Sequence, residues 1–328
     1  MSIERVCVVG GGVIGSLYAA HLSRVADVWV LTRRPEHARA LEERGLAVSG
    51  RAEFTGRVHA TDDPAALPEV DVAIVATKGT AVDAAAGAIA GRFPDAMVLT
   101  VQNGLGAEQI VRRHGSWPLV SGVTFMSGTR HDDTHVEYIL DTETWLGPYN
   151  GIPYERVEEL AELIGRSGLK ARAFPDLKPA QWSKLIFNAT VNAVAALTGL
   201  PHDPHFAAEK RTSDLGHLVH ALVDEGKAVA VAAGIELHED PWEMNVHATQ
   251  RGSAHYPSML EDVEAHRPTE IELITGSLVR EAERLGVPAP LNAAVYRLVK
   301  GKEASWRIFE RPEAESLHQT AGLDAPRR

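Results

Sequence analysis

The sequence predicts an α/β protein with an amino-terminal domain built on a parallel sheet and a carboxy-terminal all-α domain. Short apolar runs alternate with helical patterns in the first half, which is typical of strands joined by helical crossovers. After Pro175 the pattern is helical almost to the end. A chain of 328 residues is long enough for two domains. We therefore assign residues 1–175 to the first domain and residues 176–328 to the second.

The strands of the first domain are predicted from apolar runs of strand length. We expect parallel strands at Ile3–Val9, Val28–Leu31, Val70–Ala76, Met97–Val101 and Leu119–Thr124. Two later runs, His135–Leu140 and Thr144–Leu146, are close enough in sequence to form a hairpin. A helix from Pro153 to Arg166 and a short strand near Lys170–Phe174 complete this domain.

Composition excludes several classes of function. The formal charge of −11 argues against binding along a nucleic-acid backbone, although it allows a local positive pocket for a small anion. No apolar stretch is long enough to span a membrane, and the N-terminus shows no signal-peptide pattern. The single cysteine, Cys7, lies in an apolar run and is expected to be a buried thiol in a reducing compartment. We expect a cytoplasmic protein with neither nucleic-acid nor membrane partners.

Histidine pairs raise the question of a metal site. The chain has 15 histidines, and the closest pairs are His131 with His135 and His217 with His220. Neither pair has the third ligand and spacing of a recognised zinc site. We therefore expect no bound metal.

A glycine-rich loop directly follows the first predicted strand. Its residues are Gly10, Gly11, Gly12, Val13, Ile14 and Gly15, and a helix of small residues is expected at Ser16–Ser23. The first glycine allows a tight turn, the third lets a pyrophosphate approach the backbone, and the last lets the helix pack closely on the sheet. The helix N-terminus adds N–H donors. A plain strand-to-helix turn needs fewer glycines, so the spacing predicts a Rossmann-like dinucleotide-binding domain.

The end of the second strand indicates which dinucleotide is bound. A site that prefers NAD places an acidic residue about 20 residues after the loop, to bind the ribose 2′-hydroxyl. Here the strand ends in Arg33 and Arg34 instead. A guanidinium suits a phosphate group, so we predict NADPH as cofactor, with Arg33 as the first choice of ligand and Arg34 as the second. The alternative is that both are solvated surface arginines.

Two further strand ends are expected at the same edge of the sheet, where ligands bind in open α/β sheets. Lys78 follows one strand and is a candidate for an anion of the cofactor or substrate. Asn103 follows another strand and is a candidate contact to the substrate or the nicotinamide. The alternatives are a surface lysine and a turn-forming Asn-Gly pair.

Three polar residues form a stripe on an otherwise apolar helix. Lys184, Asn188 and Asn192 recur every four residues, which places them on one face over about 12 Å. Apolar residues cover most other directions, so the helix is expected to be buried and its polar groups need partners. A structural polar network would satisfy them. The alternative that we favour is the wall of an active site, with Lys184 as general acid and the two amides holding a polar substrate.

Together with the glycine loop and the Gln-Asn-Gly segment at Asn103, this helix resembles that of the ketopantoate reductases (2-dehydropantoate 2-reductases). A Ser-Met-x-x-Asp pattern that begins at Ser258, and an Arg-x-Thr-Glu-Ile pattern that begins at Arg267, are also similar to the family. The resemblance runs from Val6 to about Val299. It implies that the second domain helps to bind the substrate, and that Ser258 is a substrate contact rather than only a helix cap.

Glu270 stands out both in the resemblance and in the helical pattern. It is expected in a helix, on one face with Ile274 and Leu278, while Glu272 points away. An inward carboxylate needs a cationic or hydrogen-bonded partner, and Lys184 is the candidate if the two helices meet. The alternative is an acid favoured by a helix N-terminus.

The sequence departs from the family pattern at two histidines. His202 and His255 stand where asparagine occurs in family members, so the family's chemistry transfers more safely than its substrate. The resemblance implies NADPH-dependent reduction of a 2-oxo acid, ketopantoate, to D-pantoate. Lys184 and Glu270 would then be catalytic, and Asn103, Asn188, Asn192 and Ser258 would bind the substrate.

Other functions stay open at this point. A related reductase could act on a different 2-oxo acid or on an imine, and a β-hydroxyacid dehydrogenase also uses a buried lysine and asparagine one turn apart. A non-catalytic NADPH-binding regulator is the alternative from another class, although it would have no need of a proton donor. The helical domain is compatible with a homodimer.

Overall fold

The computed structural model describes residues 3–207, 214–250 and 256–309. The chain divides into two compact units, which we call unit 1 and unit 2. Unit 1 comprises Met1–Leu185 and Ile235–Glu239, and unit 2 comprises Ile186–Gly234 and Asp240–Arg328. None of the helices in the described ranges is long and apolar enough to cross a membrane.

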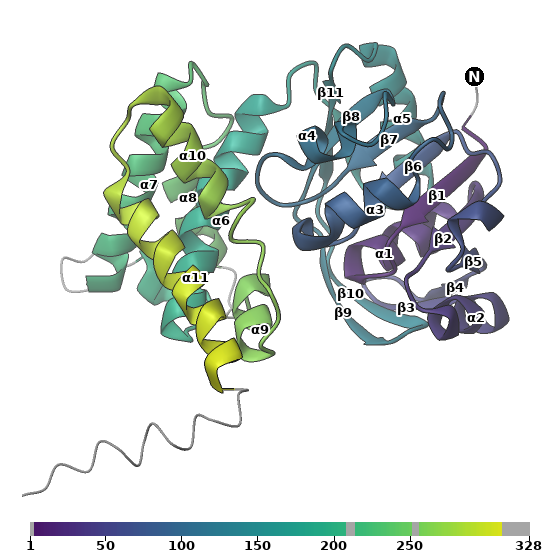
Figure 1. Cartoon of the computed structure of the whole chain (residues 1–328), viewed down its shortest axis with the longest axis horizontal. Coiled ribbons are helices and arrows are strands. Elements are labelled where there is room, and N and C mark those ends of the chain that lie inside the picture. The colour runs from purple at the N-terminus through teal and green to yellow at the C-terminus, as the bar shows by residue number, and fades with distance from the viewer. Residues whose placement is uncertain (1–2, 208–213, 251–255, 310–328) are drawn as a thin grey trace, which may run out of the picture. The chain divides into compact units, whose positions relative to one another are not determined.

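Unit 1 is built around an eight-stranded sheet (Figure 1). Its strands are β1 (Arg5–Val9), β2 (Asp27–Leu31), β5 (His59–Thr61), β6 (Val72–Val75), β7 (Met97–Thr100), β8 (Leu119–Thr124), β11 (Thr144–Tyr149) and β12 (Ala171–Ala173). The order is β12-β11-β8-β7-β6-β1-β2-β5, and only β11 and β8 pair antiparallel. All five strands predicted to be parallel lie in this sheet, which confirms the α/β class.

Helices cover both faces of this sheet because its central strands are apolar on both sides. They are α1 (Val13–Leu22), α2 (Pro35–Arg44), α3 (Val82–Ala88), α4 (Ala107–Arg112) and α5 (Tyr154–Arg166), with short 3₁₀ turns η1 (Pro64–Ala66) and η2 (Gly79–Ala81). In β1, Val6 and Val8 cluster with residues of α1 and α5, whereas Cys7 and Val9 cluster with residues of α3 and α4. Burial raises the pKa of the Cys7 thiol to about 12, so the predicted buried thiol is confirmed.

The sequence does not predict the second sheet of unit 1. Its strands are β3 (Leu46–Gly50), β4 (Phe54–Gly56), β9 (Ser127–Asp132) and β10 (His135–Leu140), in the order β4-β3-β10-β9. The predicted hairpin between His135–Leu140 and Thr144–Leu146 is wrong, because β10 pairs with β9 and β3 whereas β11 pairs with β8 and β12. The run at β10 finds its antiparallel partner on its other side, across a turn that the Asp132 carboxylate stabilises by accepting from the Thr134 N–H at 2.6 Å.

Helix α6 (Lys178–Thr198) begins in unit 1 and ends in unit 2. The division falls after residue 185, whereas the sequence places the domain boundary after residue 175. The start of α6 belongs to unit 1 because Leu177 and Ala180 form an apolar cluster with residues of β8 and β11. A glycine in β11 makes room for this contact, since a Cβ on Gly147 would lie 2.4 Å from the Cβ of Leu177.

Unit 2 consists of helices in its described part, which confirms the predicted all-α class. After α6 come the 3₁₀ turn η3 (Pro204–Ala207) and helices α7 (Asp214–Ala232), α8 (Pro241–Thr249), α9 (Ser258–Glu264), α10 (Thr275–Leu285) and α11 (Pro290–Phe309). Helix α7 packs against α10 and α11. Glu225 of α7 accepts the backbone N–H groups of Leu291 and Asn292, both at 2.9 Å, and so satisfies donors in the first turn of α11.

Two buried histidines are expected to make the stability of unit 1 depend on pH. Burial lowers the pKa of His21 and of His37 below the ordinary value of 6.5. The unfolded chain therefore binds more protons than the folded protein as the pH falls below this value, and we expect the free energy of unfolding to decrease there. Urea unfolding across this pH range measures the slope. The double variant His21→Asn, His37→Asn should show a shallower slope, and an unchanged slope would contradict the assignment.

Candidate functional site

The carboxyl ends of β1, β6 and β7 meet at one edge of the large sheet. Gly10, after β1, lies so close to Thr77, after β6, that a Cβ on Gly10 would be 2.7 Å from the Thr77 Cγ2 atom. Gln102, after β7, donates from Nε2 to the carbonyl oxygens of Val75 at 2.7 Å and Thr77 at 2.9 Å. In the strand order, β2 and β6 lie on either side of β1, so the direction in which successive strands are added to the sheet reverses beside β1. In open α/β sheets, ligands bind at such a reversal, outside the carboxyl ends of the strands.

The glycine loop after β1 fits a bound pyrophosphate. Gly10 has a φ of +108°, which favours glycine, and a Cβ on Gly15 would lie only 1.9 Å from the Gly10 carbonyl oxygen. Gly12 differs from both, because no atom of the described residues lies within 4 Å of the place where its Cβ would be. Gly10 and Gly15 are therefore required by the fold of the loop itself, whereas Gly12 leaves the backbone open to an approaching ligand.

Helix α1 begins three residues earlier than the sequence predicts, at Val13 rather than Ser16. Val13, Ile14 and Gly15 thus form its first turn, where backbone N–H groups lack acceptors within the helix. The first turn contains no acidic residue, so the positive end of the helix dipole is not neutralised there. These N–H groups are suited to bind an anionic oxygen.

The two arginines after β2 differ in their partners. Both are exposed. Arg34 donates to the carboxylates of Asp133 and, at 3.2 Å, Glu36. Arg33 makes no ion pair or hydrogen bond with any residue in the described part of the chain. Arg33 therefore presents an uncompensated positive charge at the end of β2.

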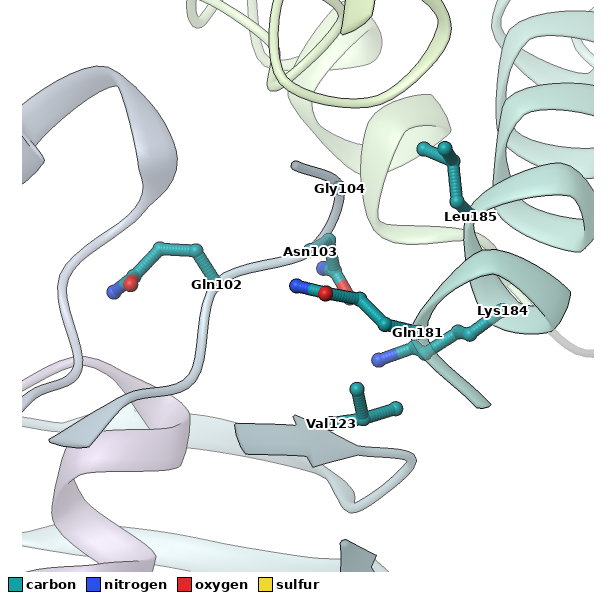
Figure 2. A pocket seen from close by; sticks show the side chains of 7 residues that line it. All are labelled: Gln102, Asn103, Gly104, Val123, Gln181, Lys184 and Leu185. Atoms are coloured by element: carbon teal, nitrogen blue, oxygen red, sulfur yellow. The ribbon is translucent and has the colours of Figure 1, made fainter. Parts of the chain in front are cut away.

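A small pocket lies beside the β7 loop in unit 1 (Figure 2). Its lining residues are Gln102, Asn103, Gly104, Val123, Gln181, Lys184 and Leu185. In Figure 2 the amide of Gln102 points away from the others, whereas the side chains of Asn103, Gln181 and Lys184 converge. The structure thus brings together two predicted site residues, Asn103 and Lys184, that lie far apart in the sequence. Lys78, the other candidate at this edge, is exposed at the start of η2.

Lys184 is the buried cation of this pocket, with 7% of its surface exposed. Its ammonium group donates to the carbonyl oxygen of Thr124 at the end of β8, and it lies 4.8 Å from the centre of the Phe125 ring. The Thr124 hydroxyl accepts from the hydroxyl of Thr144 at 3.1 Å, which helps to hold this strand end in place. The carbonyl oxygen and the face of the ring both attract positive charge at this position.

Two of the predicted site residues lie further along α6, in unit 2. Asn188 and Asn192 are each 7% exposed, which confirms that the polar stripe is buried rather than solvated. The Asn192 Oδ1 atom accepts the backbone N–H of Met259 at 3.4 Å, at the start of α9. Ser258 is exposed and is the first residue of α9, whereas Pro257 occupies the cap position before the helix. The helix-cap alternative for Ser258 is therefore wrong.

Glu270 does not lie in a helix, contrary to the sequence prediction. The segment before α10 forms a turn in which the Glu270 carbonyl accepts the N–H groups of Leu273 and Ile274, both at 3.1 Å, and α10 begins only at Thr275. The nearby Glu272 bonds Tyr296 and Lys300 in a partly exposed cluster.

Of the two histidines that depart from the family pattern, the structure describes only His202. His202 is 1% exposed, and its Nε2 atom lies 2.8 Å from the Oδ1 of Asn245, whose amide donates to the Phe206 carbonyl at 2.9 Å. A structural network therefore holds the His202 ring. His255 lies outside the described residues. The described residues contain no group of three or more histidine, cysteine or acidic side chains that could hold a metal ion.

Comparison with known proteins identifies the family to which this chain belongs. The family described as Ketopantoate reductase PanE/ApbA matches residues 6–151, and the one described as Ketopantoate reductase PanE/ApbA C terminal matches residues 176–303. The chain belongs to the ketopantoate reductase family. The 2-dehydropantoate 2-reductase of Pyrococcus horikoshii is 30% identical to it, over 92% of this chain and 98% of that protein. The same-named protein of Archaeoglobus fulgidus is 27% identical, over 93% and 99%.

Solved structures of ketopantoate reductases share the fold. The family member from Ralstonia eutropha JMP134 aligns with a TM-score of 0.83 at 25% identity, over 93% of this chain and all of that one. The 2-dehydropantoate 2-reductase from Methylococcus capsulatus aligns with a TM-score of 0.81 at 27% identity, over 94% and 99%. A D-mandelate dehydrogenase in complex with NADH aligns with a TM-score of 0.80 at 25% identity, over 92% and 99%.

The structure of this family member also shows residues near the site that the sequence patterns did not indicate. Gln181 stands three residues before Lys184 and donates to the buried carboxylate of Glu108 at 3.2 Å, which Ser121 also bonds at 2.6 Å. The helical spacing of Gln181 from Lys184 could have revealed it. Arg130 donates to the carbonyl of Gly11 at 3.2 Å. It could not have been found, because its strand, β9, has no apolar pattern.

Proposed function

We propose that this member of the ketopantoate reductase family reduces ketopantoate to D-pantoate with NADPH. The observation that carries the proposal is the pocket that the buried Lys184 lines together with Asn103 at the carboxyl edge of the sheet. The glycine loop lies at that same edge. A nicotinamide dinucleotide is supported as cofactor by this loop and by the D-mandelate dehydrogenase neighbour, which binds NADH.

Lys184 is the proposed proton donor. When bound, the cofactor supplies a hydride to the keto carbon, so that negative charge develops on the carbonyl oxygen of the substrate. Lys184 stabilises this charge and transfers a proton to the oxygen. The Thr124 carbonyl and the Phe125 ring fix the position of the ammonium, so little reorganisation is needed at the moment of reaction.

The remaining predicted residues have binding roles in this proposal. Asn103 contacts the substrate or the nicotinamide, and Lys78 contacts an anionic group of the cofactor or substrate. Asn188, Asn192 and Ser258 position the hydroxyl and carboxylate groups of the substrate. Asn188 and Asn192 follow Lys184 by one and two turns of α6. Glu270 is proposed as the second catalytic residue, and a double-mutant cycle with Lys184 measures whether the two act together.

A second candidate function is the reduction of another 2-oxo acid. The D-mandelate dehydrogenase neighbour favours it, because that protein is as similar in sequence as the ketopantoate reductase of Ralstonia eutropha JMP134, at 25% identity. The chemistry at Lys184 would be the same for both substrates. Only the groups that contact the substrate's side chain would differ.

Turnover of a substrate panel tests the proposal. NADPH oxidation, followed by the loss of nicotinamide absorbance, is measured with ketopantoate, with phenylglyoxylate (the 2-oxo acid that corresponds to mandelate) and with other 2-oxo acids. We expect the highest kcat/KM with ketopantoate. A higher value with another acid would support the second candidate. Binding of NADPH without oxidation by any of these acids would contradict both and would favour a regulator.

Replacing Arg33 tests the choice of cofactor. Arg33→Ala is expected to reduce the ratio of kcat/KM with NADPH to kcat/KM with NADH by about tenfold or more, because a charge-assisted bond to the 2′-phosphate is lost. Arg34→Ala serves as the matched control, and its effect should be smaller because the guanidinium is already paired with Asp133 and Glu36. Equal efficiency with both cofactors in the parent protein, unchanged in Arg33→Ala, would exclude this role.

A further inference from the structure

An arginine of the second sheet lies against the glycine loop. Arg130 stands on β9, and its Nη1 atom donates to the Gly11 carbonyl at 3.2 Å. Strand β9 is held beside the loop by a close contact, since a Cβ on Gly128 would lie 3.2 Å from the Cγ1 atom of Val13 in α1. The second sheet thus delivers a guanidinium to the loop whose backbone is open at Gly12.

One carboxylate near Arg130 orients its side chain, but that carboxylate is shared with a second arginine and does not cancel the charge of both. Asp133 lies 3.6 Å from the Arg130 Nη1 atom and also pairs with Arg34, so one carboxylate holds two guanidinium groups. The Arg130 side chain is 38% exposed. A guanidinium has five N–H donors in a planar fork, and the contact to Gly11 uses one of them. The others are suited to the oxygens of a phosphate group.

A buried histidine beneath the loop gives a second, independent indication of a ligand. His37 is 4% exposed, and its ring is so close to Gly11 that a Cβ there would lie 2.5 Å from the His37 Cε1 atom. The His37 Nε2 atom is buried and has no hydrogen-bond partner among the described residues. A buried polar atom of this kind indicates a partner that comes with a ligand or an ordered water molecule.

We propose that Arg130 binds the pyrophosphate of the dinucleotide, and that Asp133 positions it. This inference rests on the proposed function, because it requires a dinucleotide at the glycine loop. The pyrophosphate is favoured over the 2′-phosphate because Arg130 bonds the loop itself, whereas Arg33 stands at the end of β2, where the ribose is bound in this fold. In this proposal Arg130 therefore contacts the pyrophosphate and Arg33 contacts the 2′-phosphate.

Direct measurements of cofactor affinity distinguish the role of Arg130 from that of Arg33. The dissociation constants of NADPH and NADH are measured by titration calorimetry for the unaltered protein, Arg130→Gln, Arg33→Gln and, as a matched surface control, Arg113→Gln. We expect Arg130→Gln to raise both constants about tenfold, because a charge-assisted bond to a group common to both cofactors is lost. Arg33→Gln should weaken NADPH alone, and Arg113→Gln should change neither.

Competition by inorganic pyrophosphate provides a second readout. The inhibition constant of pyrophosphate, corrected for each variant's own affinity for NADH, should be similar for the unaltered protein and Arg33→Gln and higher for Arg130→Lys, because lysine keeps the charge but loses the fork. Thermal unfolding checks that the variants fold.

Three results would overturn the assignment. Constants for both cofactors within about twofold of the parent would exclude an Arg130 contact, and a loss confined to NADPH would move Arg130 to the 2′-phosphate. If the unaltered protein binds neither cofactor, the proposed function itself fails.

Discussion

Lys184→Ala is expected to lower kcat by about 10²–10⁴-fold, the range that general acid catalysis contributes. The variant loses the ammonium that lines the pocket with Asn103, and no other lysine or arginine of the described residues lines it. KM should change less than kcat, because the lost interaction is strongest in the transition state. Steady-state kinetics with the best 2-oxo acid of the panel measure both constants.

Two further variants separate chemistry from folding. Lys184→Met keeps an unbranched apolar side chain next to Phe125 and should show the same loss of kcat, with thermal stability nearer to that of the parent. Lys178→Ala changes an exposed lysine at the start of the same helix and should leave kcat unchanged. If Lys184→Ala or Lys184→Met kept a kcat near that of the parent, the proton donor would have to be another group.

Gly12→Ala is expected to weaken dinucleotide binding at least about tenfold, or about 1.4 kcal/mol, while leaving the fold intact. The backbone at Gly12 has a φ of −78° and a ψ of −173°, which alanine adopts readily, and in the described part of the chain no atom lies within 4 Å of the new Cβ. The methyl group therefore meets only the ligand. Titration calorimetry with NADPH, together with thermal unfolding, measures the two effects separately.

Gly15→Ala is the contrasting variant in the same loop. Its Cβ would lie 1.9 Å from the Gly10 carbonyl oxygen, so the loop must move and the unfolding temperature should fall along with cofactor affinity. The pair thus distinguishes a glycine needed by the ligand from one needed by the fold. Normal cofactor affinity in a correctly folded Gly12→Ala protein would show that the dinucleotide does not approach the loop at Gly12.

Local patterns were sufficient to predict the parts of the site that lie within one element or at its end. The glycine spacing after β1 predicted the loop because Gly10 and Gly15 meet steric requirements of the strand-to-helix turn, and Gly12 leaves room for a ligand. The recurrence of Lys184, Asn188 and Asn192 predicted a buried polar stripe because the α-helix repeats every 3.6 residues, and all three are buried.

The same reasoning failed where pairing depends on segments far apart in the chain. Strand β9 is polar and mostly exposed, and β4 has three residues, so neither carries the apolar alternation that marks a strand. The prediction therefore paired β10 with the next apolar run instead of the preceding polar one. Glu270 was placed in a helix for a related reason, because an i, i+4 pattern also fits a turn followed by a helix.

By itself the sequence determined the α/β class, the all-α second part, the glycine loop and the family resemblance, because each depends on the spacing of neighbouring residues. Only the tertiary structure decided that Lys184 and Asn103 line one pocket, and which distant groups bond: Lys184 with the Thr124 carbonyl, Arg34 with Asp133, and Arg130 with the glycine loop. These contacts join residues that are separated by up to 119 positions. Such pairs are set by strand order and by the packing of apolar faces, which no local pattern in one sequence specifies.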